Sequence, residues 1–553
     1  MATSAMAVMT TVDMDGVTVQ LVYFDNVNCK EIMFLFLLRV TSVTVKMNTI
    51  FLFLSCFPLA QSAFTFPFGG INFRPNMCQF DTSRTWFEKF DDLINDCRDQ
   101  PVRELWLDGC RTRLTRLEKL PNMPVEKLTI YHCRIEEIAD DAFENIGDTL
   151  VELDLSNNLI TQFPNLTYLT KLKKLTLRDN KILSLPYFFN DKHNGIGDGV
   201  ELSIEDLDLE YNEIAGELTK STFGWLKNLK SLNLRKNHIT GILPDALVLP
   251  NLTELYLDNN NITKLSSRVF ASCPSLLKLS LTNNQISEVY SGVFLSSDLF
   301  ELRLDYNNIT KLPNGVFDAS TSLYFLSLSN NGLTELPPHV FANLHNLTIL
   351  NLDSNKLYTL SADLFTETPK ITHLELSYNQ ISNLPAEVFS SLKKLQKLIM
   401  YFNNLTELPS GLLSNSEETE ALYFHHNQIE NVAENALPPL EYVATLCLSH
   451  NNLTTLRRSS FRKITKPKDY TRSIGSYFTI HLADNPLVCN DNLNWIVEPY
   501  SKVYENDFME HDGPYTGWRV QREMGFRLPD NPICVAPEKY ANQSVIMLTS
   551  QFK

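Results

Sequence analysis

The segment Leu252-Thr-Glu-Leu-Tyr-Leu-Asp-Asn-Asn-Asn-Ile262 decides the fold, because its frame recurs fifteen times between Val102 and Asn451. Apolar residues take positions 1, 4, 6 and 11 of the frame, and Asn or Cys takes position 9. Two other clear copies begin at Leu299 and Leu323, in a series with a spacing of about 24 residues. In Leu-x-x-Leu-x-Leu, alternate side chains point into one interior, so each copy predicts a short strand with one buried face.

Two further rows of residues accompany the strands. The Asn at position 9 can pair with backbone groups that a tight bend leaves unmatched inside a stack of turns. These residues are Asn158, Asn180, Asn212, Asn237, Asn260, Asn284, Asn307, Asn331, Asn355, Asn379, Asn403, Asn427 and Asn451, with Cys110 and Cys133 in the first two copies. A row of phenylalanines is predicted to fill the opposite side: Phe143, Phe223, Phe270, Phe294, Phe317, Phe341, Phe365, Phe389 and Phe461.

These motifs resemble the leucine-rich repeat family. The resemblance implies an α/β fold, a leucine-rich repeat solenoid (horseshoe) with a concave parallel β-sheet and an irregular or 3-10 convex side. One repeat buries too few apolar side chains to fold alone, so stacking and caps at both ends must stabilise the chain. The segment from Asn485 to Ile496, followed by Cys534, is similar to the C-terminal cap of extracellular members, although Asp491 replaces its second cysteine.

The resemblance also implies two disulfides in the caps. One joins Cys489 to Cys534, and the other joins Cys78 to Cys97 in an N-terminal cap that lacks the family's full four-cysteine pattern. After the signal, eight cysteines remain, an even number that suits an oxidising compartment. Cys110 and Cys133 could bond across adjacent turns, but two buried thiols are the favoured interpretation. Cys273 and Cys447 lie too many repeats apart to bridge each other.

Five segments are expected along the chain. Residues 1–46 form a non-native or disordered N-terminal extension, 47–63 a signal peptide, 64–101 the N-terminal cap, 102–476 the fifteen repeats, and 477–553 the last strand and C-terminal cap. Met47 begins an apolar run of about ten residues followed by small residues, which is typical of a signal peptide and too short to span a membrane. The alternative is a long, unusual leader in which Ile32–Leu38 is a further apolar run.

The compartment follows from these segments. The protein is predicted to be secreted, to the extracellular space or matrix, with no transmembrane anchor. Eight Asn-x-Ser/Thr sequons agree with secretion. Four of them carry less weight, because the repeat itself already supplies part of the sequon. The sequon residues are Asn165, Asn251, Asn261, Asn308, Asn346, Asn404, Asn452 and Asn542.

The outward positions 3, 5, 7 and 8 of the frame define the concave surface. One predicted zone is acidic, and a solvated charged face is its favoured interpretation: Glu152, Asp154, Asp206, Asp208 and Glu210, with Lys174 and Arg178. A second zone is predicted to bind a ligand, because clustered exposed aromatics match the composition of protein-binding hot spots. This aromatic patch consists of Tyr378, Ile399, Tyr401, Phe402, Tyr423, His425, His426 and His450.

Three other surface features have a possible chemical role. Three histidines of the aromatic patch could hold zinc or copper, but only Cys447 could complete such a site, so no metal is predicted and pH-sensitive binding is preferred. The insertion Tyr187–Glu201 is glycine-rich without a phosphate-binding pattern. A basic run could contact sulfated glycans or anionic lipid, or simply be solvated. It comprises Arg457, Arg458, Arg462, Lys463, Lys466, Lys468 and Arg472.

The sequence therefore favours a binding protein over an enzyme. No nucleophile motif, phosphate loop or paired carboxylate stands out from the repeats, and no cofactor is expected. The net charge of -16 argues against nucleic acid. The predicted function is binding of an extracellular protein or glycan through the concave face, in recognition, adhesion or matrix organisation, with the oligomeric state open. The alternative is a non-catalytic subunit of a secreted enzyme, similar to the leucine-rich subunit of shrimp luciferin monooxygenase.

Overall fold

The computed structural model falls into two compact units, Met1–Gly70 and Ile71–Lys553. It describes residues 7–14, 17–24, 34–40, 77–81, 103–110, 115–185, 202–296, 298–439, 443–463, 478–488, 493, 495–496, 526–527 and 533–536. The first unit contains an antiparallel sheet of β1 (Ala7–Met14), β2 (Val17–Phe24) and β3 (Phe34–Val40). Both interpretations of residues 1–46 remain predictions, and the expected signal peptide lies outside the described residues.

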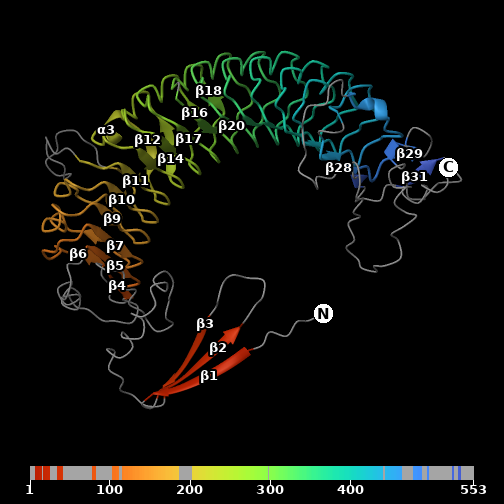
Figure 1. The fold of residues 1–553 in the computed structure, drawn as a ribbon. Coiled ribbons are helices and arrows are strands. Elements are labelled where there is room, and N and C mark those ends of the chain that lie inside the picture. Colours follow the sequence, from red (N-terminus) through yellow and green to blue (C-terminus); the bar gives the residue numbers. More distant parts are fainter. Residues whose placement is uncertain are drawn as a thin grey trace. The chain divides into compact units, whose positions relative to one another are not determined.

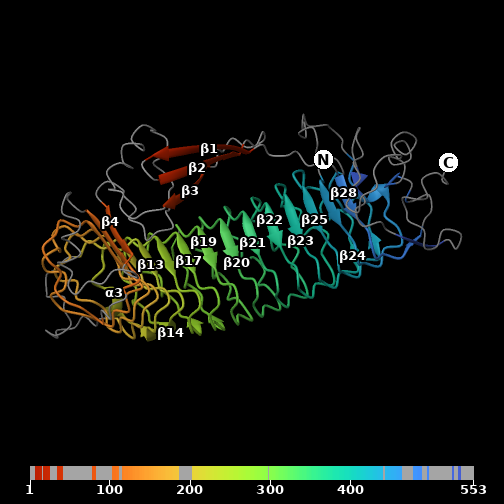
Figure 2. The ribbon, with the colours of Figure 1, turned by 90° about the horizontal axis from the view of Figure 1, so that it is seen from below.

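The second unit is built around one parallel sheet on the inner side of an arc of stacked turns (Figure 1). Its strands are β4 (Met77–Asp81), β5 (Glu104–Asp108), β7 (Lys127–Tyr131), β9 (Glu152–Asp154), β10 (Lys174–Thr176), β11 (Asp206–Asp208), β13 (Ser231–Asn233), β15 (Glu254–Tyr256), β17 (Lys278–Ser280), β19 (Glu301–Arg303), β20 (Phe325–Ser327), β21 (Ile349–Asn351), β22 (His373–Glu375), β23 (Lys397–Ile399), β25 (Ala421–Tyr423), β27 (Thr445–Cys447), β28 (Phe478–His481) and β30 (Phe526–Arg527). Each pairs in parallel with the next, as Figure 2 shows for the central strands. The register sets Leu350 opposite Leu326 and Leu374, so equal frame positions line up across turns.

The outer side of the second unit is irregular, which confirms the expected α/β solenoid. Parallel pairs of short strands join β6 (Arg116–Leu117) to β8 (Glu137–Ile138), β12 (Ala215–Leu218) to β14 (His238–Ile242), β16 (Lys264–Leu265) to β18 (Glu288–Val289), and β24 (Glu407–Leu408) to β26 (Asn431–Val432). Two short helical segments, α3 (Lys220–Phe223) and the 3-10 turn η1 (Arg458–Ser460), are described. Near the C-terminus β29 (Leu487–Val488) pairs with β31 (Cys534–Ala536).

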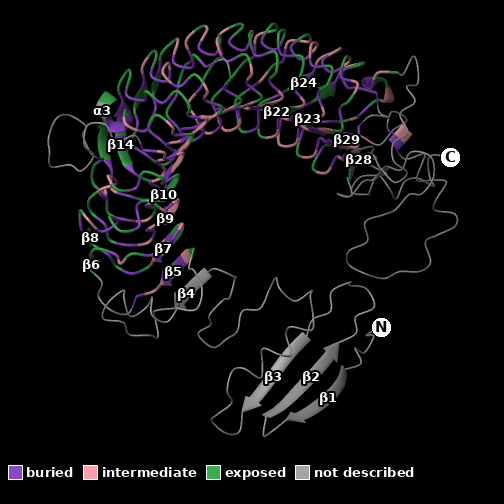
Figure 3. Cartoon of the chain, turned by 60° about the vertical axis from the view of Figure 1, so that its left-hand side comes forward, coloured by how far each residue is buried: buried purple, intermediate pink, exposed green. Residues whose placement is uncertain are grey.

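The apolar frame positions form one continuous interior (Figure 3). In the turn that carries β21, Leu347, Leu350, Leu352 and Leu357 are all fully buried. The phenylalanine row is buried as predicted, and neighbouring rings from Phe270 to Phe389 stack with centroids 5.8–6.3 Å apart. Because every turn buries its apolar side chains partly against its neighbours, stability belongs to the stack and not to one repeat.

The position-9 asparagines form the predicted internal row. The Asn355 amide donates to the Leu328 and Leu352 carbonyls, at 2.9 and 3.1 Å, and its oxygen accepts the Leu333 N–H at 3.1 Å. All thirteen predicted residues make equivalent bonds. Asn485, which the frame did not include, extends the row by donating to the Leu448 and Leu482 carbonyls. Each amide therefore ties two consecutive turns together.

The first two positions of this row are a disulfide between Cys110 and Cys133. The interpretation of these residues as two buried thiols was wrong, because stacking brings their Cα atoms within 4.4 Å, a separation that a disulfide spans. Cys273 is a buried free thiol, and burial raises its pKa to about 12. The side chains of Cys78, Cys97, Cys489 and Cys534 lie outside the described part of the structure, so the two cap disulfides stay predictions.

Candidate functional site

The aromatic patch lies on the concave face, over β22, β23, β25 and β27 and the bends that follow these strands. Its residues come from the outward frame positions of four consecutive turns. Parallel in-register pairing places Ile399 beside Tyr423, and the bends after the strands carry the remaining rings. The structure therefore brings together all eight residues that the sequence assigned to this zone, while their role in binding remains a prediction.

Position 8 of the frame produces the longer row of rings. Tyr378, Phe402, His426 and His450 all have left-handed backbone, with φ between 50° and 54°. Non-glycine residues seldom adopt this conformation, and here the bend imposes it at the same point of each turn. Ring centroids are 4.7 Å apart between Tyr378 and Phe402, 4.2 Å to His426 and 4.1 Å on to His450, with planes within 11°. The result is one continuous stack across four turns.

A shorter row at position 7 widens this stack. Tyr401 and His425 stack with centroids 4.6 Å apart, and Tyr401 meets Tyr378 edge-on at 5.4 Å. Tyr423, on β25, contacts His425 edge-on at 6.3 Å. Tyr378 is 49% exposed and Phe402 is 41% exposed, so large ring faces remain open to solvent although the rings hold one another in place.

Two histidines of the patch, His425 and His426, have lowered pKa values. Burial lowers the pKa of His425, and repulsion from His426, His450 and His481 lowers it further. The pKa of His426 is lowered by burial and by His450, with partial compensation from Asp484. His450 Nε2 lies 3.2 Å from Asp484, whereas the buried His425 Nδ1 has no hydrogen-bond partner. Within the described ranges, no group of three His, Cys, Asp or Glu residues is arranged to hold a metal ion.

The acidic zone of the N-terminal turns differs in that neighbouring cations offset much of its charge. Lys127 lies 3.0 Å from Glu152, Lys174 lies 3.8 Å from Asp206, and Arg178 and Lys236 flank Glu210 at 3.4 and 2.9 Å. Burial alone would raise the pKa of Glu210, but Lys236 and Arg178 lower it overall. Burial raises the pKa of Asp206 and Asp208. These contacts favour the solvated charged face over a ligand site.

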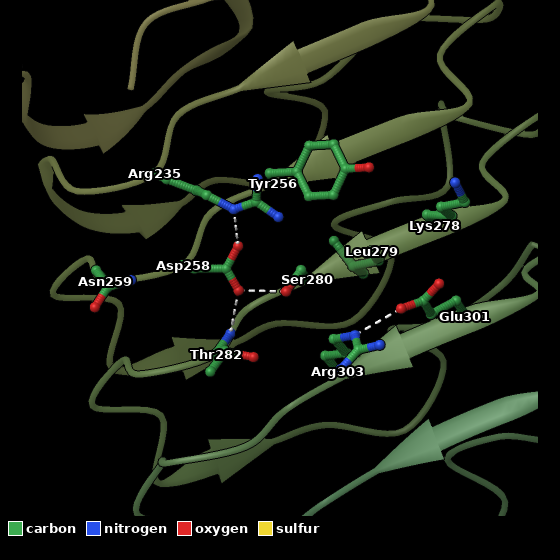
Figure 4. Close-up of a pocket in the computed structure, with 10 residues that line it drawn as sticks. All are labelled: Arg235, Tyr256, Asp258, Asn259, Lys278, Leu279, Ser280, Thr282, Glu301 and Arg303. Carbon is green, nitrogen blue, oxygen red and sulfur yellow. Dashed lines mark hydrogen bonds and ion pairs between the residues drawn. The ribbon is translucent and has the colours of Figure 1, made fainter. Parts of the chain in front are cut away.

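A shallow depression in the middle of the sheet shows a combination of groups that the sequence did not reveal (Figure 4). The Arg235 guanidinium lies 3.9 Å from the Tyr256 ring centroid and donates to Asp258 at 2.6 Å. Asp258 also accepts the Ser280 hydroxyl and the Thr282 N–H. Residues of the chain itself thus provide contacts for the arginine, the carboxylate and the aromatic face.

A second arginine, three turns later, lies between a carboxylate and an aromatic ring in a similar way. The Arg303 guanidinium lies 4.4 Å from the Phe325 ring centroid, and its Nε donates to Glu301 at 2.6 Å. Sequence reasoning missed both arrangements because each needs residues from adjacent turns in a particular rotamer. The alternation of acidic, basic and aromatic residues at outward positions was the available signal.

The other sequence candidates are only partly described. Arg462 of the basic run lies 3.8 Å from Glu417, and the Arg458 guanidinium lies 5.9 Å from the Phe461 ring. Lys466, Lys468, Arg472 and the insertion Tyr187–Glu201 lie outside the described residues.

Among the sequons, Asn165 is half-buried, Asn542 is not described, and the other six Asn residues are exposed. No described helix has the length and apolar character needed to cross a bilayer.

The repeats of this chain are similar to those of known proteins. A family model described as Leucine rich repeat matches residues 124–182, 250–309, 297–357 and 345–405, and a second repeat model matches 228–248. The chain is 30% identical to mouse keratocan over 30% of its own length and 51% of keratocan's, and 32% identical to human lumican over 28% and 50%. A match to the rat leucine-rich repeat-containing G-protein coupled receptor 5 is 36% identical but covers 24% of this chain and 16% of the receptor.

Solved structures share the fold. A structure of TLR13 with ssRNA13 has a TM-score of 0.60 at 21% identity, covering 76% of this chain and 58% of TLR13. An LRR protein of Leptospira interrogans has a TM-score of 0.52 at 27% identity, covering 68% of this chain and 93% of that protein. The chain spans about half the length of the keratocan and lumican relatives, so these likenesses concern the repeats and not whole proteins.

Proposed function

Since this chain is a leucine-rich repeat protein, we propose that it is a secreted binding protein that recognises an extracellular protein or glycan through the aromatic patch of its concave face. The observation that carries the proposal is the pair of stacked rows, in which exposed rings are held rigid by one another. Rigid aromatic side chains bury large areas at little cost in conformational entropy, which is why they dominate protein-binding hot spots.

The comparisons support an extracellular, non-catalytic role. Keratocan, lumican and epiphycan are secreted matrix proteins, and keratocan and lumican are not enzymes. TLR13 is seen with ssRNA13, but the net charge of -16 on this chain disfavours a nucleic-acid ligand, whose phosphates would be repelled. The protein's role is therefore recognition, adhesion or matrix organisation.

The shape of the patch also suits binding better than catalysis. The rings lie on an open sheet, and a reaction that must exclude water needs an enclosed site. His425 and His426, whose pKa values are lowered, stack on Tyr401 and Phe402 and so act as flat aromatic surfaces. The patch therefore offers contact area in place of a reactive group.

The test is affinity capture from extracellular fluid, with bound proteins and glycans identified by mass spectrometry. The secreted wild type is compared with the triple variant Tyr401→Ala, Phe402→Ala, Tyr423→Ala. A matched control replaces three other exposed tyrosines, Tyr211, Tyr290 and Tyr306, with Ala. We expect a partner that the wild type and the control retain and the patch variant loses. Equal retention by all three proteins would remove the patch from the binding site.

A further inference from the structure

Two carboxylates adjoin the aromatic patch on its N-terminal side. Glu375 ends β22, where it lies directly opposite Ile399 of the patch in the parallel pairing. Asp353 follows β21 and occupies the frame position that Ser377 and Tyr401 take on the next two turns. The backbone of these turns is joined throughout, for example by the Leu352 N–H donating to the Glu375 carbonyl at 2.8 Å. Carboxylates and rings thus share one surface.

These carboxylates lack the cations that offset others on the same face. Glu152, Asp206, Glu210, Glu254, Asp258 and Glu301 each lie within 4.0 Å of a lysine or arginine nitrogen. No described residue forms such an ion pair with Asp353 or Glu375. The nearby Lys397 ammonium lies 5.6 Å from the Tyr423 ring centroid and only partly relieves Glu375.

The local electrostatics agree with an excess of negative charge. Burial raises the pKa of Glu375, and Asp353 raises it further. Burial also raises the pKa of Asp353, against the lowering effect of a hydrogen bond from Ser354 and with a further contribution from Asp305. Burial is also the main cause of the raised pKa of Tyr401, followed by the charges of Glu375 and Asp353. The ring surface nearest the carboxylates therefore lies in a field that attracts a cation.

One buried hydroxyl beside these groups has no partner of normal hydrogen-bond geometry among the described residues. Ser377 lies between Asp353 and Tyr401 in the position-7 row and is fully buried. It is close enough to Tyr401 to influence that residue's pKa, but its Oγ makes no hydrogen bond of normal geometry. Buried hydroxyl groups are rarely left unsatisfied, so this one is a second sign of an incomplete polar site.

The depression in the middle of the sheet shows which group completes such a site. Arg235 joins Asp258 to the Tyr256 ring, and Arg303 joins Glu301 to the Phe325 ring. At Glu375, Asp353 and the rings of Tyr378 and Tyr401, carboxylates and aromatic faces are present, and no arginine of the described residues is paired with them. A guanidinium suits all of them, because it pairs with carboxylates, stacks on aromatic rings and is weakly hydrated.

We propose that Asp353, Glu375, Tyr378 and Tyr401 bind an arginine side chain of an extracellular protein partner. The inference rests on the proposed function and specifies its ligand: a protein segment whose arginine takes the place that Arg235 and Arg303 fill elsewhere on the sheet. The flanking rings of Phe402 and His426 then contact the residues beside that arginine. A metal ion is a poorer occupant, because the described residues offer two carboxylates here and no third metal ligand.

The experiment uses the full-length secreted protein and a fluorescein-labelled decapeptide of alternating glycine and arginine. The same peptide with citrulline in place of arginine keeps the shape and removes the charge. In fluorescence anisotropy, the variant Asp353→Asn, Glu375→Gln should bind the arginine peptide at least about tenfold more weakly than wild type, since a charge-assisted hydrogen bond contributes at least that much. The affinity of the wild type should fall by a similar factor when the citrulline peptide replaces the arginine peptide.

A matched variant separates this site from general attraction to an acidic protein. Asp154→Asn, Asp206→Asn removes two charges from the same face, far along the sheet, and should change the affinity by no more than about twofold because solvent and salt screen distant charges. Equal weakening by both double variants would overturn the inference, as would equal binding of the arginine and citrulline peptides.

Two further readouts keep the interpretation clear. Because Asp353 and Glu375 are uncompensated, Asp353→Asn, Glu375→Gln should unfold at the same temperature as wild type or higher, so lost binding is not lost folding. In the affinity capture, a partner that is lost by the aromatic triple variant but kept by Asp353→Asn, Glu375→Gln would sink the arginine site and leave the proposed function intact. A partner kept by both would sink both proposals.

Discussion

A single asparagine per turn satisfies backbone groups of two turns at once. Asn355 alone binds the carbonyls of Leu328 and Leu352 and the N–H of Leu333, all deep in the interior. Backbone groups buried without partners cost far more than an average hydrogen bond contributes, because water cannot replace the lost contact. This asymmetry explains why the frame admits so few residue types at position 9.

Asn355→Ala should therefore destabilise the protein strongly. The buried Leu333 N–H loses its partner, and the Leu328 and Leu352 carbonyls each lose one of their two asparagine donors. An unsatisfied buried group costs about 1–3 kcal/mol. We expect a marked drop in the thermal unfolding midpoint and in the secreted yield. The exposed Asn383→Ala is the control and should shift stability by less than about 0.5 kcal/mol. Similar behaviour of the two variants would contradict the role of the asparagine row.

The patch histidines make stability depend on pH in a defined direction. The pKa values of His425 and His426 are lowered in the folded state, so the unfolded chain binds more protons as the pH falls below about 6.5. The free energy of unfolding therefore decreases from that pH downward through the folded-state pKa values. Burial is the main cause of both shifts. His426, His450 and His481 lower the pKa of His425 further, and for His426 the neighbours are His450, which lowers the pKa, and Asp484, which raises it.

The measurement is the thermal unfolding midpoint between pH 7.5 and 5.0 for wild type and for His425→Asn, His426→Asn. Asparagine is chosen because it tolerates the left-handed backbone at position 426. The variant should lose less stability over this interval than the wild type. Parallel curves for the two proteins would show that the histidine stack does not titrate with folding.

At the scale of elements, the first described turns are joined covalently. The disulfide joins the turn that carries β5 to the turn that carries β7 and closes a loop with a sequence separation of 23 residues. Its two cysteines occupy the frame position that asparagine takes in later turns. The bond joins the first two repeats, next to β4, which pairs with β5 on its N-terminal side. Since solenoid turns depend on adjacent turns, a covalent link here protects the stack from opening at its end.

Cys110→Ser, Cys133→Ser should destabilise these turns by roughly 3 kcal/mol, the cost expected when a disulfide closing such a loop is removed. Hydrogen exchange followed by mass spectrometry should show faster exchange in β5, β7 and β9. Exchange in β20 to β23 should be unchanged, because the repeats interact with their neighbours only. Uniformly faster exchange along the whole sheet would argue against local protection.

The sequence predicted those elements whose residues recur at fixed positions. Strands, asparagine row and phenylalanine row follow from apolar and amide side chains spaced by one turn. The disulfide was not predicted, because it depends on a Cα separation that only the stacking sets. The uncompensated charge of the half-buried Asp353 and Glu375 was missed for a related reason. Whether a carboxylate is compensated depends on which cations reach it from adjacent turns.

At the scale of the whole molecule, the exposed sequons avoid the outward positions of the sheet. Asn261, Asn308, Asn404 and Asn452 occupy position 10, and Asn251 and Asn346 precede the first apolar residue of their turns. Glycans at these sites would leave positions 3, 5, 7 and 8 uncovered. Asn404 and Asn452 border the aromatic patch without belonging to it.

Enzymatic removal of N-glycans should therefore leave the captured partner unchanged in identity and in amount. Glycopeptide mapping by mass spectrometry identifies which of the six exposed sequons carry glycans, and the capture is then repeated with the deglycosylated protein. Loss of the partner after deglycosylation would mean that glycans contribute to the binding surface. The untreated protein, incubated in the same buffer, is the control.

The in-register alignment of equal frame positions makes the concave face a set of interchangeable sites. Because outward residues at one turn have counterparts at every other turn, a designer could graft the eight patch residues onto the corresponding positions of turns nearer the N-terminus without altering the leucine, asparagine or phenylalanine rows. Recognition would then move along the scaffold while the interior stayed the same. The repeat thus gives this protein a surface whose specificity can be relocated by exchanging a few side chains.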